Sequence, residues 1–211
     1  MSELSTKDLS FYYTKDKPIL KELNLAFERG KIYAIVGKSG AGKTTLLSLL
    51  SQLQSPKDGH IYYEGQDISN INADHYRSCN IGVVFQSYNL LPSWNAIENV
   101  SLSLDIANWK ESDKKTHAKM LLEKMQIDES DMHRAVHQLS GGQQQRVAIA
   151  RAISYNPSII LADEPTGNLD KATEKEILTI FQQLAYEEDK CVILVTHASS
   201  VTKIADEIYR L

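Results

Sequence analysis

Cysteine and long apolar runs are the two features that this sequence has least of. Only two cysteines occur among its 211 residues, Cys79 and Cys191, far apart in the chain. They exclude a disulfide framework and a zinc-binding spacing, and they favour a reducing compartment. Cys191 opens an apolar stretch, so we expect a buried thiol there. No apolar run approaches the roughly 20 residues that a membrane-spanning helix needs, so any membrane role would depend on a partner.

An excess of basic charge is also missing. Lysine and arginine total 23 against 27 aspartates and glutamates, which leaves a net charge of −4. Because broad nucleic-acid binding needs a basic face, we do not expect nucleic acid as a partner. The first eight residues are polar and charged, so no signal peptide is expected. The length fits one domain, or one domain with an inserted subdomain.

The glycine-rich stretch at residues 37–45 is the most informative part of the chain. Its residues are Gly37, Lys38, Ser39, Gly40, Ala41, Gly42, Lys43, Thr44 and Thr45. A β-branched apolar run precedes it and helix formers follow it, which is the strand–loop–helix context of a phosphate-binding loop. Glycine backbone N–H groups can form a nest for an anion, and the helix start adds partial positive charge. In such a loop Lys43 can reach the β- and γ-phosphates, and Thr44 can offer its hydroxyl to Mg²⁺.

Apolar patterning predicts an α/β chain with a helical insert. We expect strands over residues 4–13, 19–27, 32–36, 61–63, 81–85, 158–164 and 191–195, and helices over about 43–53, 73–77, 96–104, 114–125, 141–153 and 171–188. Turn residues at 16–18, 29–31, 55–59 and 165–170 separate them. Strand signals vanish between about residues 87 and 156, where helical spacing dominates.

Polar side chains directly follow several of the apolar strands. They are Gln86, the neighbouring Asp163 and Glu164, and His197. Ligands collect at the carboxyl edge of an open parallel sheet, so these side chains are expected near the phosphate loop. Asp163 is then placed to deliver a carboxylate to Mg²⁺, Glu164 to polarise an attacking water, and His197 to point at the γ-phosphate region.

Two tyrosines end the first predicted strand. Tyr12 and Tyr13 are adjacent, so their side chains point to opposite faces and only one of them can serve a given site. An aromatic ring at this position is able to stack on adenine, because every base offers a π-face. The pattern alone leaves open which tyrosine does so.

A capped helix start at residues 140–143 suggests a second anion site. Ser140 is a good N-cap, and Gln143 stands where a capping box places Glu or Gln. The intervening Gly141 and Gly142 cost helix stability, which indicates that another group approaches the backbone closely. Two glycine N–H groups at a helix start are able to face a phosphate.

Together these motifs resemble the nucleotide-binding domain of ATP-binding cassette (ABC) proteins over nearly the whole chain. The motifs, in chain order, are the phosphate loop, the glutamine after a strand, Leu139–Gln143, Ile159–Glu164, Asn168–Asp170 and His197. The resemblance implies a P-loop NTPase (RecA-like) parallel-sheet core with an antiparallel β subdomain and an inserted α-helical subdomain. A single domain would then span residues 1–211, with the core at 1–86 and 157–211 and the helical subdomain at about 87–156.

The resemblance also implies roles for single residues within one chain. Tyr13 matches the adenine-stacking aromatic, with Tyr12 as the alternative, and residues 37–45 match the phosphate loop. Gln86 matches the residue that senses Mg²⁺ and contacts the permease. Asp163 matches the Mg²⁺ carboxylate. Two further matches complete the site: Glu164 with the catalytic base and His197 with the γ-phosphate switch.

Other matches imply that two chains work together. Ser140, Gly141, Gly142 and Gln143 match the signature, which in this family closes on the ATP of the opposite subunit. Asp170 matches a residue that makes a dimer contact. The implied partners are therefore a second copy of the chain and a transmembrane permease.

Several segments are similar to the macrolide-export and lipoprotein-release branch, notably residues 85–92, 98–100, 143–151 and 165–170. Small bacteriocin and peptide exporters have cassettes of comparable brevity. The resemblance implies an ATP hydrolase with ATP and Mg²⁺ as cofactors, which powers export of peptide, antimicrobial or lipoprotein-type cargo. Such a subunit is cytoplasmic and peripheral on the inner face of the cell membrane. The alternative is a cassette that regulates a membrane complex mechanically, as in the control of cell-wall hydrolases.

Overall fold

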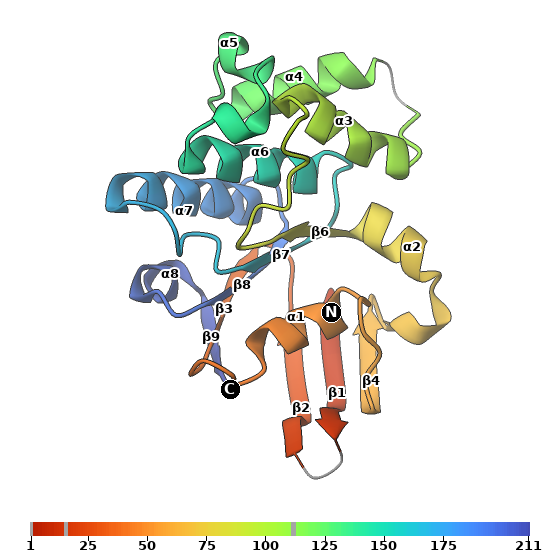
Figure 1. Cartoon of the computed structure of the whole chain (residues 1–211). Helices are drawn as coiled ribbons and strands as arrows, with labels where there is room; N and C mark the ends of the chain where they lie inside the picture. The colour runs from red at the N-terminus through yellow and green to blue at the C-terminus, as the bar shows by residue number, and fades with distance from the viewer. Residues whose placement is uncertain (1, 15–16, 111–112) are drawn as a thin grey trace.

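A central parallel sheet separates an antiparallel sheet from a cover of helices in the computed structural model, which describes residues 2–14, 17–110 and 113–211 (Figure 1). The parallel sheet has the order β6-β7-β8-β3-β9. Its strands are β3 (Lys31–Val36), β6 (Ile81–Val84), β7 (Ile159–Asp163), β8 (Cys191–Thr196) and β9 (Glu207–Arg210). All neighbouring strands of this sheet pair in parallel. The carboxyl ends of β6, β7, β8 and β9 therefore lie at the same edge of the sheet as the carboxyl end of β3.

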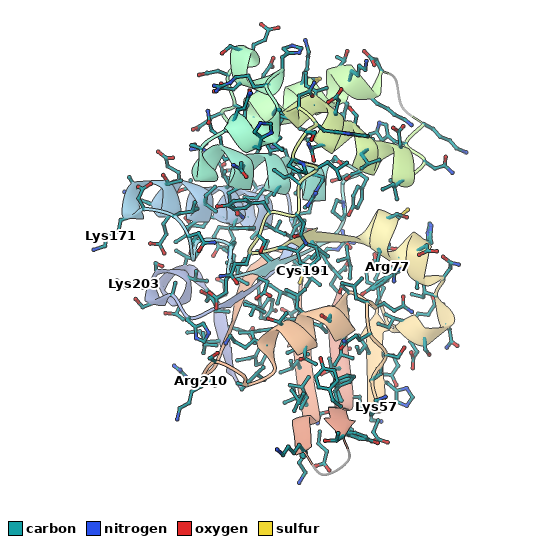
Figure 2. All side chains as sticks on the ribbon, viewed as in Figure 1. Lys57, Arg77, Lys171, Cys191, Lys203 and Arg210 are labelled. Carbon is teal, nitrogen blue, oxygen red and sulfur yellow. The ribbon has the colours of Figure 1, made fainter. Side chains whose placement is uncertain are left out.

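Both faces of this sheet are buried, which explains the near-continuous apolar runs of its inner strands. In β3, Ile32 and Ala34 belong to the core under the helices, while Tyr33 and Ile35 belong to the core shared with the antiparallel sheet. Cys191 of β8 is fully buried, as predicted, in the core shared with the antiparallel sheet (Figure 2).

The antiparallel sheet has the order β2-β1-β4-β5. It consists of β1 (Leu4–Thr14), β2 (Lys17–Phe27), β4 (Asp58–Tyr63) and β5 (Gln66–Asp67), and it packs with α1 (Lys43–Leu50) over one shared core. Phe27 stands edge-on to Tyr33 with ring centroids 5.0 Å apart, which joins this sheet to the central one. The short elements η1 (Ile68–Asn70), α2 (Ala73–His75) and the π-helical η2 (Tyr76–Asn80) lead back into β6.

Four α-helices and one 3₁₀ helix of the described chain lie between β6 and β7. They are α3 (Ala96–Ile106), α4 (Lys114–Lys124), α5 (Glu129–Met132), η3 (Val136–Gln138) and α6 (Gly141–Ile153), with α7 (Lys171–Tyr186) and α8 (Ser199–Ile204) following later. Asn95 and Glu98 form a capping box at the start of α3. In the part of the chain that the structure describes, no helix is both long and apolar enough to cross a membrane.

Several boundaries differ from the sequence predictions. The β4 strand starts at Asp58 because Gly59, with φ +79°, lies so close to β1 that a Cβ there would be 2.3 Å from the Asp8 carbonyl oxygen. The predicted turn at 16–18 includes Asp16, which lies outside the described residues, while Lys17 and Pro18 already belong to β2. Neither α8 nor β9 was predicted, because β9 is a four-residue edge strand with a mostly exposed, partly charged sequence.

Candidate functional site

The phosphate loop and the carboxyl ends of three strands enclose a cavity of about 820 Å³. Its lining residues come from distant parts of the chain and include eleven of the residues predicted from sequence. They are Tyr13, Ile19, Ser39, Gly40, Gly42, Lys43, Thr44, Thr45, Gln86, Asp163, Glu164, Gly167, His197 and Ala198. Parallel strand order is what brings Gln86, Asp163 and His197 together, because each follows or ends a strand of the same sheet.

Glycine is required in the phosphate loop at the start of α1. Gly40 and Gly42 have φ of +80° and +94°, a conformation that L side chains rarely adopt. A Cβ on Gly42 would also lie 2.6 Å from Ile19 Cγ2. The backbone at this turn is therefore bare, and the first N–H groups of the helix behind it are free to face an anion.

Lys43 is buried in the cavity floor, with 7% of its surface exposed. Its Nζ donates to the carbonyl oxygens of Gly37 at 3.0 Å and Lys38 at 3.3 Å, and it lies 2.8 Å from His197 Nε2. An ammonium group can only donate, so His197 Nε2 is the acceptor in this contact. All three acceptors hold the ammonium where phosphate oxygens could replace them.

Thr44 and Asp163 form an oxygen pair that suits a magnesium ion. Thr44 Oγ1 donates to Asp163 Oδ2 at 2.9 Å, and both residues line the cavity. Burial raises the pKa of Asp163, although the hydrogen bond from Thr44 acts against this shift. Mg²⁺ prefers oxygen ligands and usually takes one or two from the protein, with phosphates and water completing its shell. The described residues contain no cluster of three or more His, Cys, Asp or Glu that could hold a metal without a substrate.

Glu164 lies just beyond β7 rather than within the predicted strand, with φ of 44°. Its Oε2 accepts hydrogen bonds from Thr196 Oγ1 and from the His197 backbone N–H, both at 3.2 Å. Its Oε1 is buried and has no hydrogen-bond partner in the described structure, and it lies 3.4 Å from His197 Nε2. Leaving a buried acceptor unsatisfied costs free energy, so this oxygen is available to a water proton.

The structure distinguishes the two tyrosines that the sequence left open. Tyr13 lines the cavity and is 67% exposed, while its ring stands edge-on to Phe11 at a centroid distance of 5.1 Å. Tyr12 is half-buried and does not line the cavity. Tyr13 is thus the aromatic side chain that borders the phosphate loop.

The residues of the predicted signature lie outside this cavity. Ser140 Oγ accepts from the Gln143 N–H at 3.3 Å, and Gln143 Oε1 accepts from the Ser140 N–H at 2.9 Å, which completes the capping box of α6. A Cβ on Gly142 would lie 2.5 Å from Thr173 Cγ2 of α7. The close approach inferred from the two glycines is therefore partly a packing contact within the chain.

Asp170 also lies outside the cavity, where it caps α7. Its Oδ1 accepts from the N–H groups of Ala172 at 3.0 Å and Thr173 at 3.1 Å, and its Oδ2 accepts from Thr173 Oγ1 at 2.6 Å. These hydrogen bonds, with that of the Thr173 hydroxyl the largest, lower the pKa of Asp170. The chain therefore presents two separate surfaces, one with the phosphate loop and one with the signature.

Sequence reasoning missed some residues of the site. Ile19, Gly167 and Ala198 line the cavity, and Thr196 supports Glu164. Thr196 had a usable signal, since it ends the strand that delivers His197. No pattern marks Ile19, which reaches the cavity only because β2 lies behind the phosphate loop.

Comparison with known proteins decides what kind of site this is. A model of the family described as ABC transporter matches residues 20–167. The chain belongs to the ABC transporter family. This ABC chain is 46% identical over 212 residues to the uncharacterised ABC transporter ATP-binding protein YclH of Bacillus subtilis, which covers 100% of this chain and 94% of YclH. It is an ATP-binding cassette that hydrolyses ATP.

A second relative is much longer than this cassette. The macrolide export ATP-binding/permease protein MacB of Syntrophobacter fumaroxidans is 46% identical over 201 residues, which cover 93% of this chain but 28% of MacB. Among solved structures, the dimeric post-hydrolysis state of the cassette MJ0796 bound to ADP and Pi has a TM-score of 0.90 at 34% identity. It covers 99% of this chain and 94% of that one. The likeness confirms the predicted P-loop NTPase fold.

The buried Asp163 gives the ABC cassette a testable pH dependence. Its raised pKa means that the folded chain keeps this proton to higher pH than the unfolded chain. The ionised carboxylate of Asp163 therefore destabilises the fold. This destabilisation is absent below about pH 3.9, the pKa of an unfolded Asp, and reaches its full size above the pKa of the folded state. Asp163→Asn should therefore be more stable than the unchanged protein at about pH 8, and the difference should shrink towards pH 4.

Urea unfolding without nucleotide or Mg²⁺ measures this difference. Asp170→Asn is the matched control, because hydrogen bonds lower the pKa of Asp170 and the sign reverses. Its carboxylate stabilises the fold above the unfolded pKa, and this contribution is lost as pH falls through the folded pKa. Asp170→Asn should therefore be the less stable variant at about pH 8. Equal stability of Asp163→Asn and the unchanged protein at that pH would contradict the account.

Proposed function

We propose that this chain is the ATP-hydrolysing subunit of a membrane exporter and that two copies enclose two ATP molecules between them. The observation that carries this proposal is the separation of the two anion-binding surfaces. The cavity gathers the phosphate loop, the Thr44–Asp163 pair and Glu164, whereas the exposed Ser140 at the start of α6 lies outside it. A second copy would bring its signature over this cavity, and the dimeric state of MJ0796 supports such an arrangement.

Within one copy the phosphate loop holds the nucleotide. Residues 37–45 wrap the phosphates with backbone N–H groups, and Lys43 exchanges its present acceptors for phosphate oxygens. Thr44, Asp163 and Gln86 would hold Mg²⁺, which neutralises charge on the β- and γ-phosphate oxygens when bound. Tyr13 stacks on the adenine ring at the open side of the cavity.

Glu164 is the general base in this proposal. Its unpartnered Oε1 accepts a hydrogen bond from the water that attacks the γ-phosphate. His197 is released when Lys43 turns to the phosphates, and its ring then faces the γ-phosphate region. The backbone N–H of His197 keeps Oε2 of Glu164 in place throughout.

The second copy completes the site from the opposite side. Its Ser140, Gly141, Gly142 and Gln143 present a helix start with free N–H groups, which favours the negative γ-phosphate. Asp170 lies close to that helix start through Thr173 and contacts the other chain. Hydrolysis removes the shared γ-phosphate, and the two copies separate.

Residues 85–92 are here called the glutamine loop. A groove beside this loop is suited to bind the permease. This groove measures about 240 Å³ and lies between β6, η2 and the end of α6. Its lining includes Leu53, which is 52% exposed, together with Phe85, Tyr155 and Arg77, the last shown in Figure 2. A groove of this kind accepts a short apolar segment of a membrane protein. The MacB relative supports this pairing, because its name joins an ATP-binding part to a permease.

Cargo, location and motion complete the proposal. The complex exports a peptide, antimicrobial or lipoprotein-type cargo, and the cassette sits on the cytoplasmic side of the membrane through its permease. Residues 87–156 act as the helical subdomain that passes motion from the nucleotide to that permease. Reconstitution with the membrane protein that co-purifies with the chain tests export; ATP turnover without cargo movement would favour mechanical regulation instead.

Tyr13 and Tyr12 offer a matched test of adenine stacking. Tyr13→Ala should weaken ATP binding by about 1–3 kcal/mol, the range for loss of one base–aromatic stack. Tyr12→Ala should change it by less than about 0.5 kcal/mol, because that side chain does not line the cavity. Inorganic triphosphate has no base, so its affinity should be the same in both variants. Calorimetric titration measures the affinity of each variant for ATP and for triphosphate. Equal ATP affinity in the two variants would refute the stacking role.

Glu164→Gln should trap the ATP-bound pair. Losing a general base slows turnover by about 10²-fold or more, while the amide still fits the site. Light scattering after gel filtration with ATP and Mg²⁺ should then show a dimer, and with ADP a monomer. Glu187→Gln makes the same chemical change at an exposed position of the chain and should leave both turnover and assembly unchanged. Full turnover in Glu164→Gln would remove this residue from the proposed chemistry.

A further inference from the structure

Arg151 lines the groove proposed for the permease, but the proposed function gives its charge no role. It stands in the last turn of α6, half-buried, and no carboxylate of the described residues (2–14, 17–110 and 113–211) pairs with it. Instead Nη2 donates to the carbonyl oxygen of Tyr88 at 2.8 Å and Nη1 to that of Asn89 at 2.5 Å. Burying a guanidinium without an acid is costly, so these two hydrogen bonds need a further reason.

The two carbonyls belong to the glutamine loop, in a conformation that needs support. Tyr88 and Asn89 have φ of 61° and 50°, which bulky residues such as tyrosine seldom adopt. The Tyr88 N–H donates to the Phe85 carbonyl oxygen at 3.0 Å, so Gln86 lies inside the turn that Tyr88 closes. The planar fork of Arg151 matches two neighbouring carbonyls and holds this turn in one shape.

The same loop also contacts the opposite end of α6. The Tyr88 hydroxyl lies 3.2 Å from the position that a Cβ on Gly141 would take. Tyr88 therefore reaches α6 twice, through its carbonyl at the helix end and through its ring at the signature. Leu169, next to Asp170, approaches the same Gly141 position at 3.9 Å.

We propose that Arg151 is a positioning residue that fastens the glutamine loop to α6, so that nucleotide sensed at Gln86 in one site moves the signature that serves the other site. The inference rests on the proposed function, because only a paired cassette has a second site to serve. Arg151 does not line the nucleotide cavity, so it acts through Tyr88, whose hydroxyl approaches Gly141 of the signature. Its loss should uncouple the two surfaces and leave nucleotide affinity intact.

Amide hydrogen exchange with and without MgATP tests this coupling in the dilute monomer. All chains carry Glu164→Gln so that nucleotide persists. In this parent, MgATP should change exchange both in the glutamine loop and at residues 140–144. With Arg151→Ala, the change at residues 140–144 should disappear, the affinity of the monomer for MgATP should stay within about twofold, and ATP-driven dimerisation should weaken by about tenfold.

Arg146→Ala is the matched control. This residue lies on the same helix and is more deeply buried, but it donates to Met125, Gln126 and Glu176 rather than to the glutamine loop. The Arg146→Ala variant should be less stable than the parent, but MgATP should still change amide exchange at residues 140–144. Arg151→Lys keeps the charge but lacks the fork, so it should restore folding without restoring the coupling, and it serves if Arg151→Ala does not fold.

Two results would overturn the inference. The first is a full exchange response to MgATP at residues 140–144 in both Arg151 variants. The second is loss of this response in Arg146→Ala to the same extent as in Arg151→Ala, which would indicate a general effect of destabilising α6. A parent chain that never dimerises with ATP would contradict the proposed function instead. The exchange response of the monomer would still decide whether Arg151 couples the two surfaces.

Discussion

The site depends on one edge of the central sheet, where β3, β6, β7 and β8 all end beside the start of α1. Parallel pairing in the order β6-β7-β8-β3 fixes the distances between their terminal side chains. The hydrogen bond from Thr44 to Asp163, at 2.9 Å, joins the phosphate loop to this edge directly. Without the buried strands there would be no edge, and the carboxylates and the histidine would be scattered along the chain.

Separation of the phosphate loop from the signature follows from the same architecture. The helices that carry the signature enter between β6 and β7, and the start of α6 does not line the cavity beside the phosphate loop. Its capping box and the close packing of Gly142 on Thr173 keep that helix start rigid and bare. Arg151 then links the other end of α6 to the loop that carries Gln86. One helix thus carries the signature at its start and, through Arg151 near its end, contacts the loop that also contains Gln86.

Much of the fold could be predicted because local patterns agreed with the final structure. Apolar strands such as Ile32–Val36 and the capped start of α6 needed no distant information. The edge strand β9 and the helix α8 escaped prediction, since their stability comes from contacts with β3 and α7 rather than from their own sequence. Motif order marked most of the cavity lining, but Ile19 and the hydrogen bonds of Arg151 depend on the packing of segments far apart in the chain.

Dependence of ATP turnover on protein concentration tests the paired-cassette account most directly. Steady-state hydrolysis by the unchanged chain, without permease, should be measured across dilutions at which sedimentation reports monomer or dimer. We predict that turnover per chain falls steadily as dimers dissociate, because a lone cavity lacks the signature of its partner. Undiminished turnover in a solution that contains only monomers would contradict the account.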